Sequence, residues 1–257
     1  MNMKVDLCGV TLNNPVMTAS GTFGSGAEYA EFVDLNKLGA VVTKGVANVP
    51  WPGNPTPRVA EVYGGMLNAV GLQNPGIDLF VERDIPFLKQ FDTKIMVNVC
   101  GHSTEEYIEV VERLRDQPVD LLEINISCPN VKEGGIAFGQ DPKAVEAITK
   151  EMKKHAAQPV IMKLSPNVTD ITEMARAAEA GGADGLSLIN TITGMKIDIN
   201  RQKFVLANKT GGMSGPAIHP VAVRMVYQTA QAVRLPIVGM GGIMNAEDAI
   251  EMILAGA

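Results

Sequence analysis

The sequence predicts an α/β fold, a TIM (β/α)8 barrel whose eighth strand and C-terminal segment are missing from this chain. Three observations lead to this prediction. Apolar runs of strand length alternate with helical patterns, which indicates βαβ units and a parallel sheet. Nearly every strand ends in a polar side chain, at the end where parallel barrels carry their active sites. A length of 257 residues, 46% of them hydrophobic, suits one barrel domain spanning residues 1–257.

The first elements are short. Residues 1–12 are expected to form a hairpin with a turn at Asn13 and Asn14, and PVMTAS (15–20) is expected to be the first buried strand. The glycine run GTFGSG (21–26) departs from the spacing of dinucleotide-binding loops. A tight turn and a phosphate-binding loop therefore both stay open for this run.

The second strand is followed by a long excursion. A helical stretch over 29–38 precedes GAVVTKG, which places Lys44 at the end of the second strand. A proline-rich segment (49–58) and NAVGLQNPG (68–76) come next. Loops of this length directly after a strand are usually functional in a compact domain.

The later strands are apolar runs that end in polar residues or glycine: 94–99, 119–130, 159–166, 183–191 and 235–243. Helices between them are expected to begin at N-cap residues, namely Ser103, Asp141, Asp170 and, after a helix over 220–233, Asn245. A second long insertion spans 192–213, and KFVLAN within it is expected to be half of a small hairpin.

The last residues resemble segments that lead into strands. LGA (38–40) and GGA (181–183) each come just before a strand, and the chain ends in LAGA (254–257). An eighth strand is therefore expected to begin where this sequence stops. Because the usual barrel is larger, the natural protein is expected to be roughly 40 residues longer.

Composition and charge exclude several classes of protein. A formal charge of −6, a pI near 5.2 and no clustered basic stripe argue against nucleic acid or an anionic membrane as partner. No apolar run is long enough for a signal peptide or a membrane span, so a soluble cytoplasmic protein is expected. The three cysteines lack metal-ligand spacing, and neither a metal site nor a disulfide framework is expected.

The polar residues at the strand ends form a set whose members all face one mouth of the predicted barrel: Ser20, Lys44, Asn98, Asn125, Lys163, Asn190, Gly241 and Gly242. Asparagine amides suit a planar ring with alternating N–H and C=O groups, and lysines suit negative charge. The glycines of GMGGI lie where barrels commonly bind phosphate. The set therefore predicts a phosphorylated cofactor and a small heterocyclic or carboxylated substrate.

Single residues have simpler explanations as well. Lys163 could pair with a carboxylate, and Asn68 and Asn74 could be ordinary turn residues. Cys100 is expected to be a small buried hydrophobic residue. Cys128 lies in a loop between asparagines, which favours a reactive thiol over an apolar pocket.

Longer motifs resemble a known family. ASGTFG, TKG, NAVGLQNPG, VNVCG, EINISCPNVKEGG, MKLSPN, LINT, GGMSGPAIHP and VGMGGI occur in the order found in the catalytic subunit of dihydroorotate dehydrogenase, a flavin enzyme of pyrimidine synthesis. The resemblance covers nearly the whole chain, and NISCPN with a downstream MKLSPN is highly specific. NVKEGGIAFG resembles the NAD-linked branch, in which a partner subunit carries FAD and a [2Fe–2S] cluster.

The resemblance also implies site residues. FMN would contact Ser20, Lys44, Gly45, Asn98, Asn125, Lys163, Ile189, Gly215, Gly241 and Gly242. Dihydroorotate or orotate would contact Lys44, Asn68, Ala69, Val70, Gly71, Leu72, Asn125, Asn130, Asn190 and Thr191. Cys128 would be the base that removes a proton from carbon 5 of dihydroorotate, while a hydride leaves carbon 6 for the flavin. The assembly implied is a homodimer core within a heterotetramer.

Three other functions stay open from the sequence. The first is a homodimeric, fumarate-reducing dihydroorotate dehydrogenase or a related pyrimidine-reducing flavoprotein. The second is a lyase barrel that uses Lys44 or Lys163 as a Schiff base with a phosphorylated substrate. The third is a binding subunit without catalysis, which the intact polar strand ends disfavour.

Overall fold

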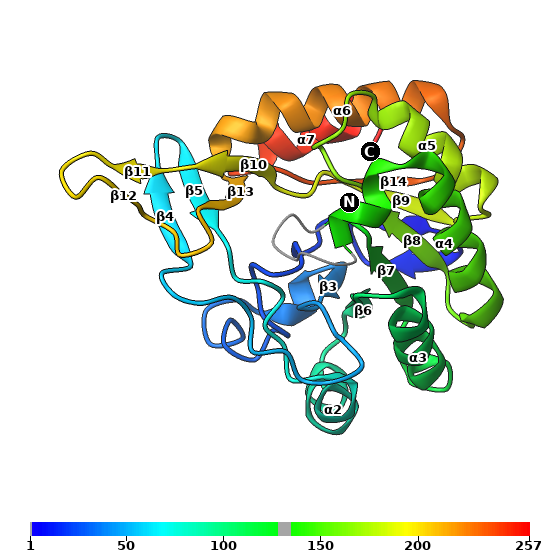
Figure 1. Cartoon of the computed structure of the whole chain (residues 1–257). Coiled ribbons are helices and arrows are strands. Elements are labelled where there is room, and N and C mark those ends of the chain that lie inside the picture. Colours follow the sequence, from blue (N-terminus) through cyan, green and yellow to red (C-terminus); the bar gives the residue numbers. More distant parts are fainter. Residues whose placement is uncertain (1, 128–134) are drawn as a thin grey trace.

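The computed structural model describes residues 2–127 and 135–257. Its centre is a six-stranded parallel sheet that curls on itself, with helices on its outer face (Figure 1). The strand order across the sheet is β14 (Ile237–Gly239), β9 (Gly185–Leu188), β8 (Val160–Lys163), β7 (Leu121–Asn125), β6 (Lys94–Val99) and β3 (Ala40–Val42). Strands taken in chain order are neighbours throughout, as a (β/α)8 barrel requires. The expected fold class is confirmed, with the barrel incomplete in this chain.

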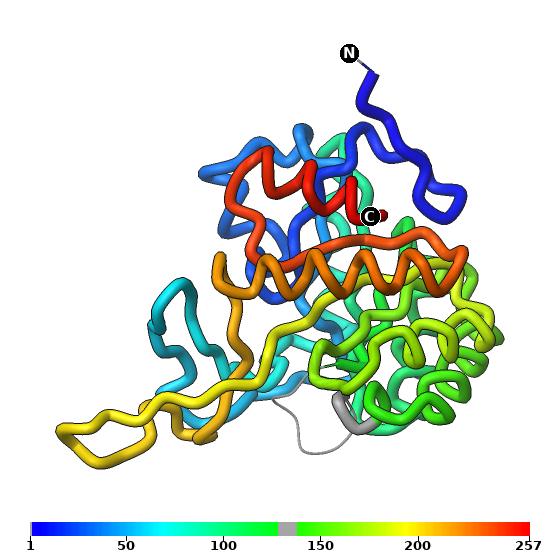
Figure 2. The backbone as a smooth tube through the Cα atoms, turned by 90° about the horizontal axis from the view of Figure 1, so that it is seen from above, coloured from blue at the N-terminus to red at the C-terminus, as the bar shows by residue number. Residues whose placement is uncertain are grey.

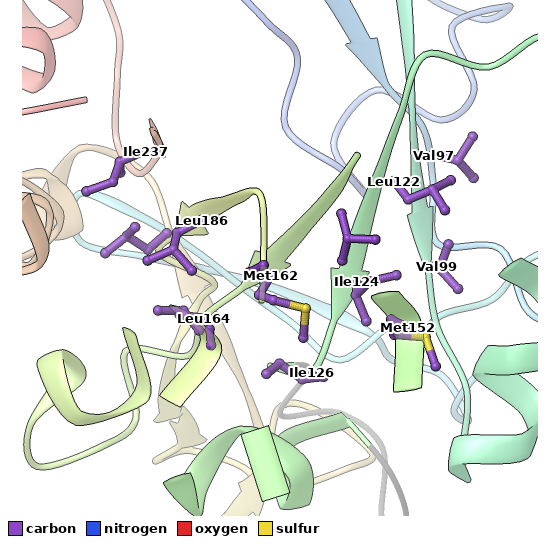
Figure 3. Packing of buried hydrophobic residues seen from close by; sticks show 14 of the residues in the cluster. Val97, Val99, Leu122, Ile124, Ile126, Met152, Met162, Leu164, Leu186 and Ile237 are labelled. Atoms are coloured by element: carbon purple, nitrogen blue, oxygen red, sulfur yellow. The ribbon is translucent and has the colours of Figure 1, made fainter. Parts of the chain in front are cut away.

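Alternation along the strands separates two apolar layers, because successive side chains point to opposite faces. The outward side chains pack under the helices, as Val97, Leu122 and Met162 do in Figure 3. The inward side chains form a smaller cluster that includes Val42, Met96, Leu121, Ile161 and Val238. This inner cluster lies below the strand ends and forms the floor of the site.

The helices are α3 (Thr104–Leu114), α4 (Pro142–His155), α5 (Ile171–Ala180), α6 (His219–Ala232) and α7 (Ala246–Leu254). Four of them begin at the expected N-caps. The side chains of Ser103, Asp141, Asp170 and Asn245 each accept a hydrogen bond from a backbone N–H in the first turn. Before them, a shorter helical run consists of α1 (Ile77–Leu79), a π-helical stretch (Phe80–Asp84) and α2 (Ile85–Leu88).

The N-terminal hairpin is confirmed, but its turn lies elsewhere. β1 (Val5–Leu7) and β2 (Val10–Leu12) are joined at Cys8 and Gly9, whose φ angles are 54° and 83°. Two consecutive positive φ angles are typical of a tight hairpin turn, whereas Asn13 and Asn14 come after the second strand. Leu7 and Leu12 join the inner apolar cluster. The hairpin lies at the opposite side of the molecule from the hairpin of β11 (Ile197–Asp198) and β12 (Lys203–Phe204) (Figure 2).

Two predictions for residues 15–38 are wrong. The segment 15–20 is no buried strand, because it forms only a parallel bridge from Met17 to Ala40 and Val16 is 50% exposed. The helix expected over 29–38 is reduced to a 3₁₀ turn at Leu35–Lys37. Turns occupy residues 20–33, and Phe32 is 81% exposed, so the apolar residues of this segment supply no continuous face for a helix to bury.

The two long excursions meet in a separate antiparallel sheet. Its order is β10 (Ile192–Met195), β13 (Thr210–Ser214), β5 (Gly65–Asn68) and β4 (Val59–Val62). β11 (Ile197–Asp198) and β12 (Lys203–Phe204) form the small hairpin expected around KFVLAN. This sheet projects from the side of the barrel (Figure 1), and β5 and β13 run side by side.

In the part of the chain that the structure describes, none of the helices has both the length and the apolar character needed to cross a membrane.

Candidate functional site

Three polar side chains lie at the same edge of the parallel sheet because they end neighbouring strands. Asn98 lies near the end of β6, Asn125 ends β7 and Lys163 ends β8. Asn125 is paired in register with Lys163, and Asn98 is paired with Glu123. All four are at most 4% exposed. The predicted gathering of polar residues at the strand ends is therefore present in the fold.

Glu123 lies at the centre of this group. Its Oε2 atom accepts a hydrogen bond from Nδ2 of Asn98 at 2.6 Å and lies 3.5 Å from Nζ of Lys163. Its Oε1 atom accepts from the hydroxyl of Ser187 on β9 at 2.7 Å. A buried carboxylate is costly unless it is paired and hydrogen-bonded, and here donors from three other strands meet that requirement.

A chain of amides extends from this carboxylate. Asn125 donates from Nδ2 to Oδ1 of Asn98 at 3.2 Å, and Asn190 donates from Nδ2 to Oδ1 of Asn125 at 3.5 Å. The backbone N–H of Ser127 also donates to Oδ1 of Asn125, and that of Thr191 donates to Oδ1 of Asn190. The side-chain oxygens of Asn98, Asn125 and Asn190 therefore each accept a hydrogen bond that fixes the orientation of the amide.

Lys44 lies beside the glycine run that follows the first segment. Its backbone N–H donates to the carbonyl of Gly24 at 2.9 Å, and a Cβ built on Gly21 would lie 3.6 Å from its Nζ atom. Residues 21–26 adopt turns. Ser20 directly precedes Gly21. The two residues expected to contact the cofactor here, Ser20 and Lys44, therefore lie close together.

Gly45 connects the strand ends to the excursion. A Cβ at this position would lie 3.0 Å from Oδ1 of Asn98 and 3.2 Å from Cδ2 of Leu72. Leu72 packs with the buried Cys100, whose side chain is 0% exposed, as expected for a small hydrophobic residue. Asn74 accepts from the N–H groups of Ala47 and Gly76, so it acts as a buried turn residue.

The segment Asn68–Leu72 meets the amide chain through β13. Asn68 pairs with Gly212 and donates from Nδ2 to its carbonyl at 3.3 Å. A Cβ on Gly212 would overlap the hydroxyl of Thr191. Of the other residues in the segment, Ala69, Gly71 and Leu72 are buried and Val70 is half-buried. The contact through Gly212 places the excursion beside Asn190 and Thr191.

A glycine corner lies where β9 and β14 end. Gly215, Gly241 and Gly242 have φ angles of 113°, 129° and 68°, which side chains rarely adopt. A Cβ on Gly242 would lie 2.7 Å from the carbonyl of Gly215, and one on Gly241 would lie 3.5 Å from Cγ1 of Ile189. These four residues therefore form one compact backbone cluster.

At the neighbouring N-terminus of α7, backbone N–H groups already donate to side chains of the same segment. Asn245 accepts from the N–H of Asp248, and Asp248 accepts from the N–H of Met244 at 2.8 Å. Glu247 adds a second acid to the first turn. Negative charge at this turn disfavours a phosphate there, which leaves the glycine corner as the better anion site.

Several site residues were missed from the sequence. Glu123, Ser127, Ser187 and Tyr107 were not proposed, although Tyr107 donates from its hydroxyl to the carbonyl of Asn125 at 2.6 Å. A charged residue inside the apolar run 119–126 was the available clue to Glu123. The serines and the tyrosine carry no comparable pattern, since their roles depend on strand neighbours.

Two predicted residues, Cys128 and Asn130, lie outside the described residues. Among residues 2–127 and 135–257, no three His, Cys, Asp or Glu side chains gather as metal ligands.

Comparisons with known proteins agree with this arrangement. The family model of dihydroorotate dehydrogenase matches residues 2–257. A protein of Lachnoclostridium phytofermentans named dihydroorotate dehydrogenase B (NAD(+)), catalytic subunit, is 75% identical over 257 residues, which is 100% of this chain and 86% of that protein. A protein of the same name from Geobacter sulfurreducens is 57% identical over 100% of this chain and 84% of its own length.

A crystal structure of the enzyme from Eimeria tenella, described as DHODH in complex with ferulenol, superposes with a TM-score of 0.82. It covers 100% of this chain and 77% of its own, at 22% identity, so this likeness concerns the fold alone. The family match and the close relatives, together with the amide and lysine cluster at the strand ends, lead to one conclusion: the chain belongs to the dihydroorotate dehydrogenase family, a family of FMN-dependent oxidoreductases.

Proposed function

We propose that this chain is the catalytic subunit of an NAD⁺-linked dihydroorotate dehydrogenase, which oxidises dihydroorotate to orotate in pyrimidine biosynthesis. The observation that carries the proposal is the cluster of Asn98, Asn125, Asn190 and Lys163 at one edge of the parallel sheet. The printed names of the relatives support the NAD⁺-linked type. Residues 1–257 are proposed to act as one FMN-binding domain in the cytoplasm.

The residues at the strand ends fit FMN. The amides of Asn98 and Asn125 and the ammonium of Lys163 match a planar ring that carries both polar edges and negative charge. Gly215, Gly241 and Gly242 adopt positive φ angles near the ends of β9 and β14, the region where barrels commonly bind phosphate. The proposed FMN-binding set is Ser20, Lys44, Gly45, Asn98, Asn125, Lys163, Ile189, Gly215, Gly241 and Gly242.

The proposed substrate site lies between the amide chain and the excursion. Gly212 brings Thr191 next to the strand that carries Asn68, so two segments far apart in sequence face the same ligand. The proposed set for dihydroorotate and orotate is Lys44, Asn68, Ala69, Val70, Gly71, Leu72, Asn125, Asn130, Asn190 and Thr191. Uncharged amides suit a pyrimidine ring, and Lys44 suits the orotate carboxylate.

The reaction removes two hydrogens from dihydroorotate. We assign Cys128 as the base that takes the proton from carbon 5, since a thiolate is a competent proton acceptor near its pKa. When bound, FMN supplies the acceptor for the hydride that leaves carbon 6. Lys163 would stabilise the negative charge that this transfer adds, because a fixed ammonium in a dry site stabilises charge more strongly than water does.

The electrons are proposed to leave through a second subunit that carries FAD and a [2Fe–2S] cluster and reduces NAD⁺. The name "catalytic subunit" of the relatives supports such a partner. The proposed assembly is a homodimer of this chain within a heterotetramer. Expression together with the neighbouring genes should yield a brown complex that reduces NAD⁺, whereas fumarate reduction by this chain alone would favour the homodimeric type.

The deciding experiment is the visible spectrum of the purified chain, titrated with dihydroorotate under anaerobic conditions. A flavin band that bleaches on addition supports the proposal. A colourless protein that forms a borohydride-trapped substrate adduct would contradict it in favour of a Schiff-base lyase. Lys163 is a poor candidate for such a nucleophile, because its amine is paired with Glu123 and a nucleophilic amine must be neutral.

A further inference from the structure

Glu123 is a fully buried carboxylate in the middle of the site, and the proposed reaction does not yet use it. It is 0% exposed on β7, above the inner apolar cluster, with Lys163 at 4% exposure beside it. A charge in such a place is retained only where it is compensated. Its presence therefore calls for a specific electrostatic role.

The contacts of Glu123 orient the side chains of Asn98 and Lys163. The carboxylate can only accept hydrogen bonds, so Asn98 must turn its Nδ2 atom toward Glu123, at 2.6 Å, and its Oδ1 atom away. Lys163 directs its ammonium to the same oxygen, at 3.5 Å. The second oxygen accepts from Ser187 at 2.7 Å.

Lys44 and Lys163 are the basic groups of the proposed cofactor site. Because Glu123 and Lys163 carry opposite formal charges and lie 3.5 Å apart, this pair contributes a net charge near zero to the interior of the sheet. The positive field at the strand ends is then weaker than two lysines alone would produce, since a charge and its counter-ion cancel at a distance.

We propose that Glu123 is a positioning residue that acts through Lys163 and Asn98: it is the counter-ion that sets how strongly Lys163 favours the reduced over the oxidised form of bound FMN. This inference rests on the proposed function. Glu123 lies outside the expected FMN-binding set. The inference assigns to it the control of the reduction potential of bound FMN.

Glu123→Gln tests the charge with little change in shape. The glutamine oxygen can still accept from Asn98, and its nitrogen can donate to Ser187, whose hydroxyl then accepts. We expect reduced FMN to gain at least tenfold in binding over oxidised FMN relative to the wild type, which is about +30 mV for a two-electron couple. The measurement is the midpoint potential of bound FMN against redox dyes, together with the Kd of oxidised FMN.

Ser187→Ala is the matched control, because it removes one hydrogen bond to the same carboxylate and leaves the charge in place. We expect its ratio of reduced to oxidised FMN affinity to change less than twofold. An equal shift in both variants would mean that packing near Glu123, and not its charge, controls the potential, and would overturn the inference.

A second comparison covers a failure of Glu123→Gln to fold. Lys163→Met and the double variant Glu123→Gln with Lys163→Met differ only in the carboxylate, and the double variant leaves no buried charge without a partner. Because Lys163 is absent from both proteins, the carboxylate has no ammonium to act through, and the two midpoint potentials should be equal. A higher potential in the double variant would mean that the carboxylate acts on the flavin directly. That result, or equal potentials in wild type and Glu123→Gln, would overturn the inference alone, whereas a wild-type chain that binds no FMN would overturn the proposed function.

Discussion

Gly212 on β13 lies so close to Thr191 that a Cβ at this position would overlap the threonine hydroxyl. This contact joins the antiparallel sheet to the end of β9, since Gly212 is also the pairing partner of Asn68. Two parts of the proposed substrate site therefore depend on the absence of a side chain at one residue.

Gly212→Ala should displace Thr191 and weaken the handling of dihydroorotate. We expect kcat/KM for dihydroorotate to fall roughly 10- to 100-fold, because small misplacements of positioning groups are costly, while FMN binding stays unchanged. Steady-state kinetics and an FMN titration check this. The control is Gly194→Ala on β10, where a Cβ would lie 3.1 Å from the flexible side chain of Leu67. A similar loss in the control would contradict a specific role for the Thr191 contact.

Cys128→Ala should bind FMN and orotate but lose turnover. Removal of a general base usually lowers the rate about 10²- to 10⁴-fold, and we expect a loss in that range at neutral pH. Rapid mixing with dihydroorotate, followed at the flavin band, measures the step directly. Cys8→Ser is the matched control, because Cys8 contacts Asp184 next to the N-terminal hairpin. Near-full reduction in Cys128→Ala would remove this thiol from the mechanism.

The thiol of Cys8 should resist alkylation. Burial and then the charges of Asp184 and Asp6 raise the pKa of Cys8 from 9.0 to about 11. A difference of about two units leaves roughly one-hundredth of the usual thiolate at neutral pH. Iodoacetamide labelling with peptide mapping at pH 8 should show Cys8 reacting far more slowly than the same peptide in urea.

The same shift predicts how stability depends on pH. Because the folded pKa of Cys8 lies above the unfolded value, folding favours the neutral thiol. Its contribution to the free energy of unfolding is fully present below pH 9.0 and is lost as the pH rises toward about 11. Urea unfolding of the wild type and of Cys8→Ser between pH 7 and 11 checks this. If the free energy of unfolding depended on pH in the same way in both proteins, the loss of stability could not be assigned to Cys8.

Leu12→Ala should destabilise the protein through the floor of the barrel. Leu12 is 1% exposed and packs in the inner apolar cluster, so its truncation should cost about 2–5 kcal/mol. The midpoint of urea unfolding measures the loss. Val5→Ala in the same hairpin removes a side chain that is 36% exposed and should cost less than about 1 kcal/mol.

Local patterns predicted the helices and most strands because the relevant physics is local. The caps at Ser103, Asp141, Asp170 and Asn245 need only a side-chain oxygen and the next turn of backbone. PVMTAS failed as a buried strand because burial requires neighbours on both sides, and this segment joins β3 by one bridge at Met17 and by hydrogen bonds of Thr18.

In the site, too, residues set by local patterns were predictable and contacts between distant strands were not. Asn98, Asn125 and Lys163 were predictable because each ends an apolar run. The role of Glu123 was not, because its partners Ser187 and Lys163 come from other strands, and only the register of the sheet brings them together. A sequence shows that a charge is present in a strand but not which donors it will meet.

The floor of the barrel joins residues that lie far apart in the sequence. Leu7 and Leu12 pack in the same layer as Val238. The ribosome therefore releases the N-terminal hairpin long before β14 exists to complete its apolar surroundings. During synthesis these leucines remain open to chaperones, and the layer can close only after Val238 has emerged from the ribosome.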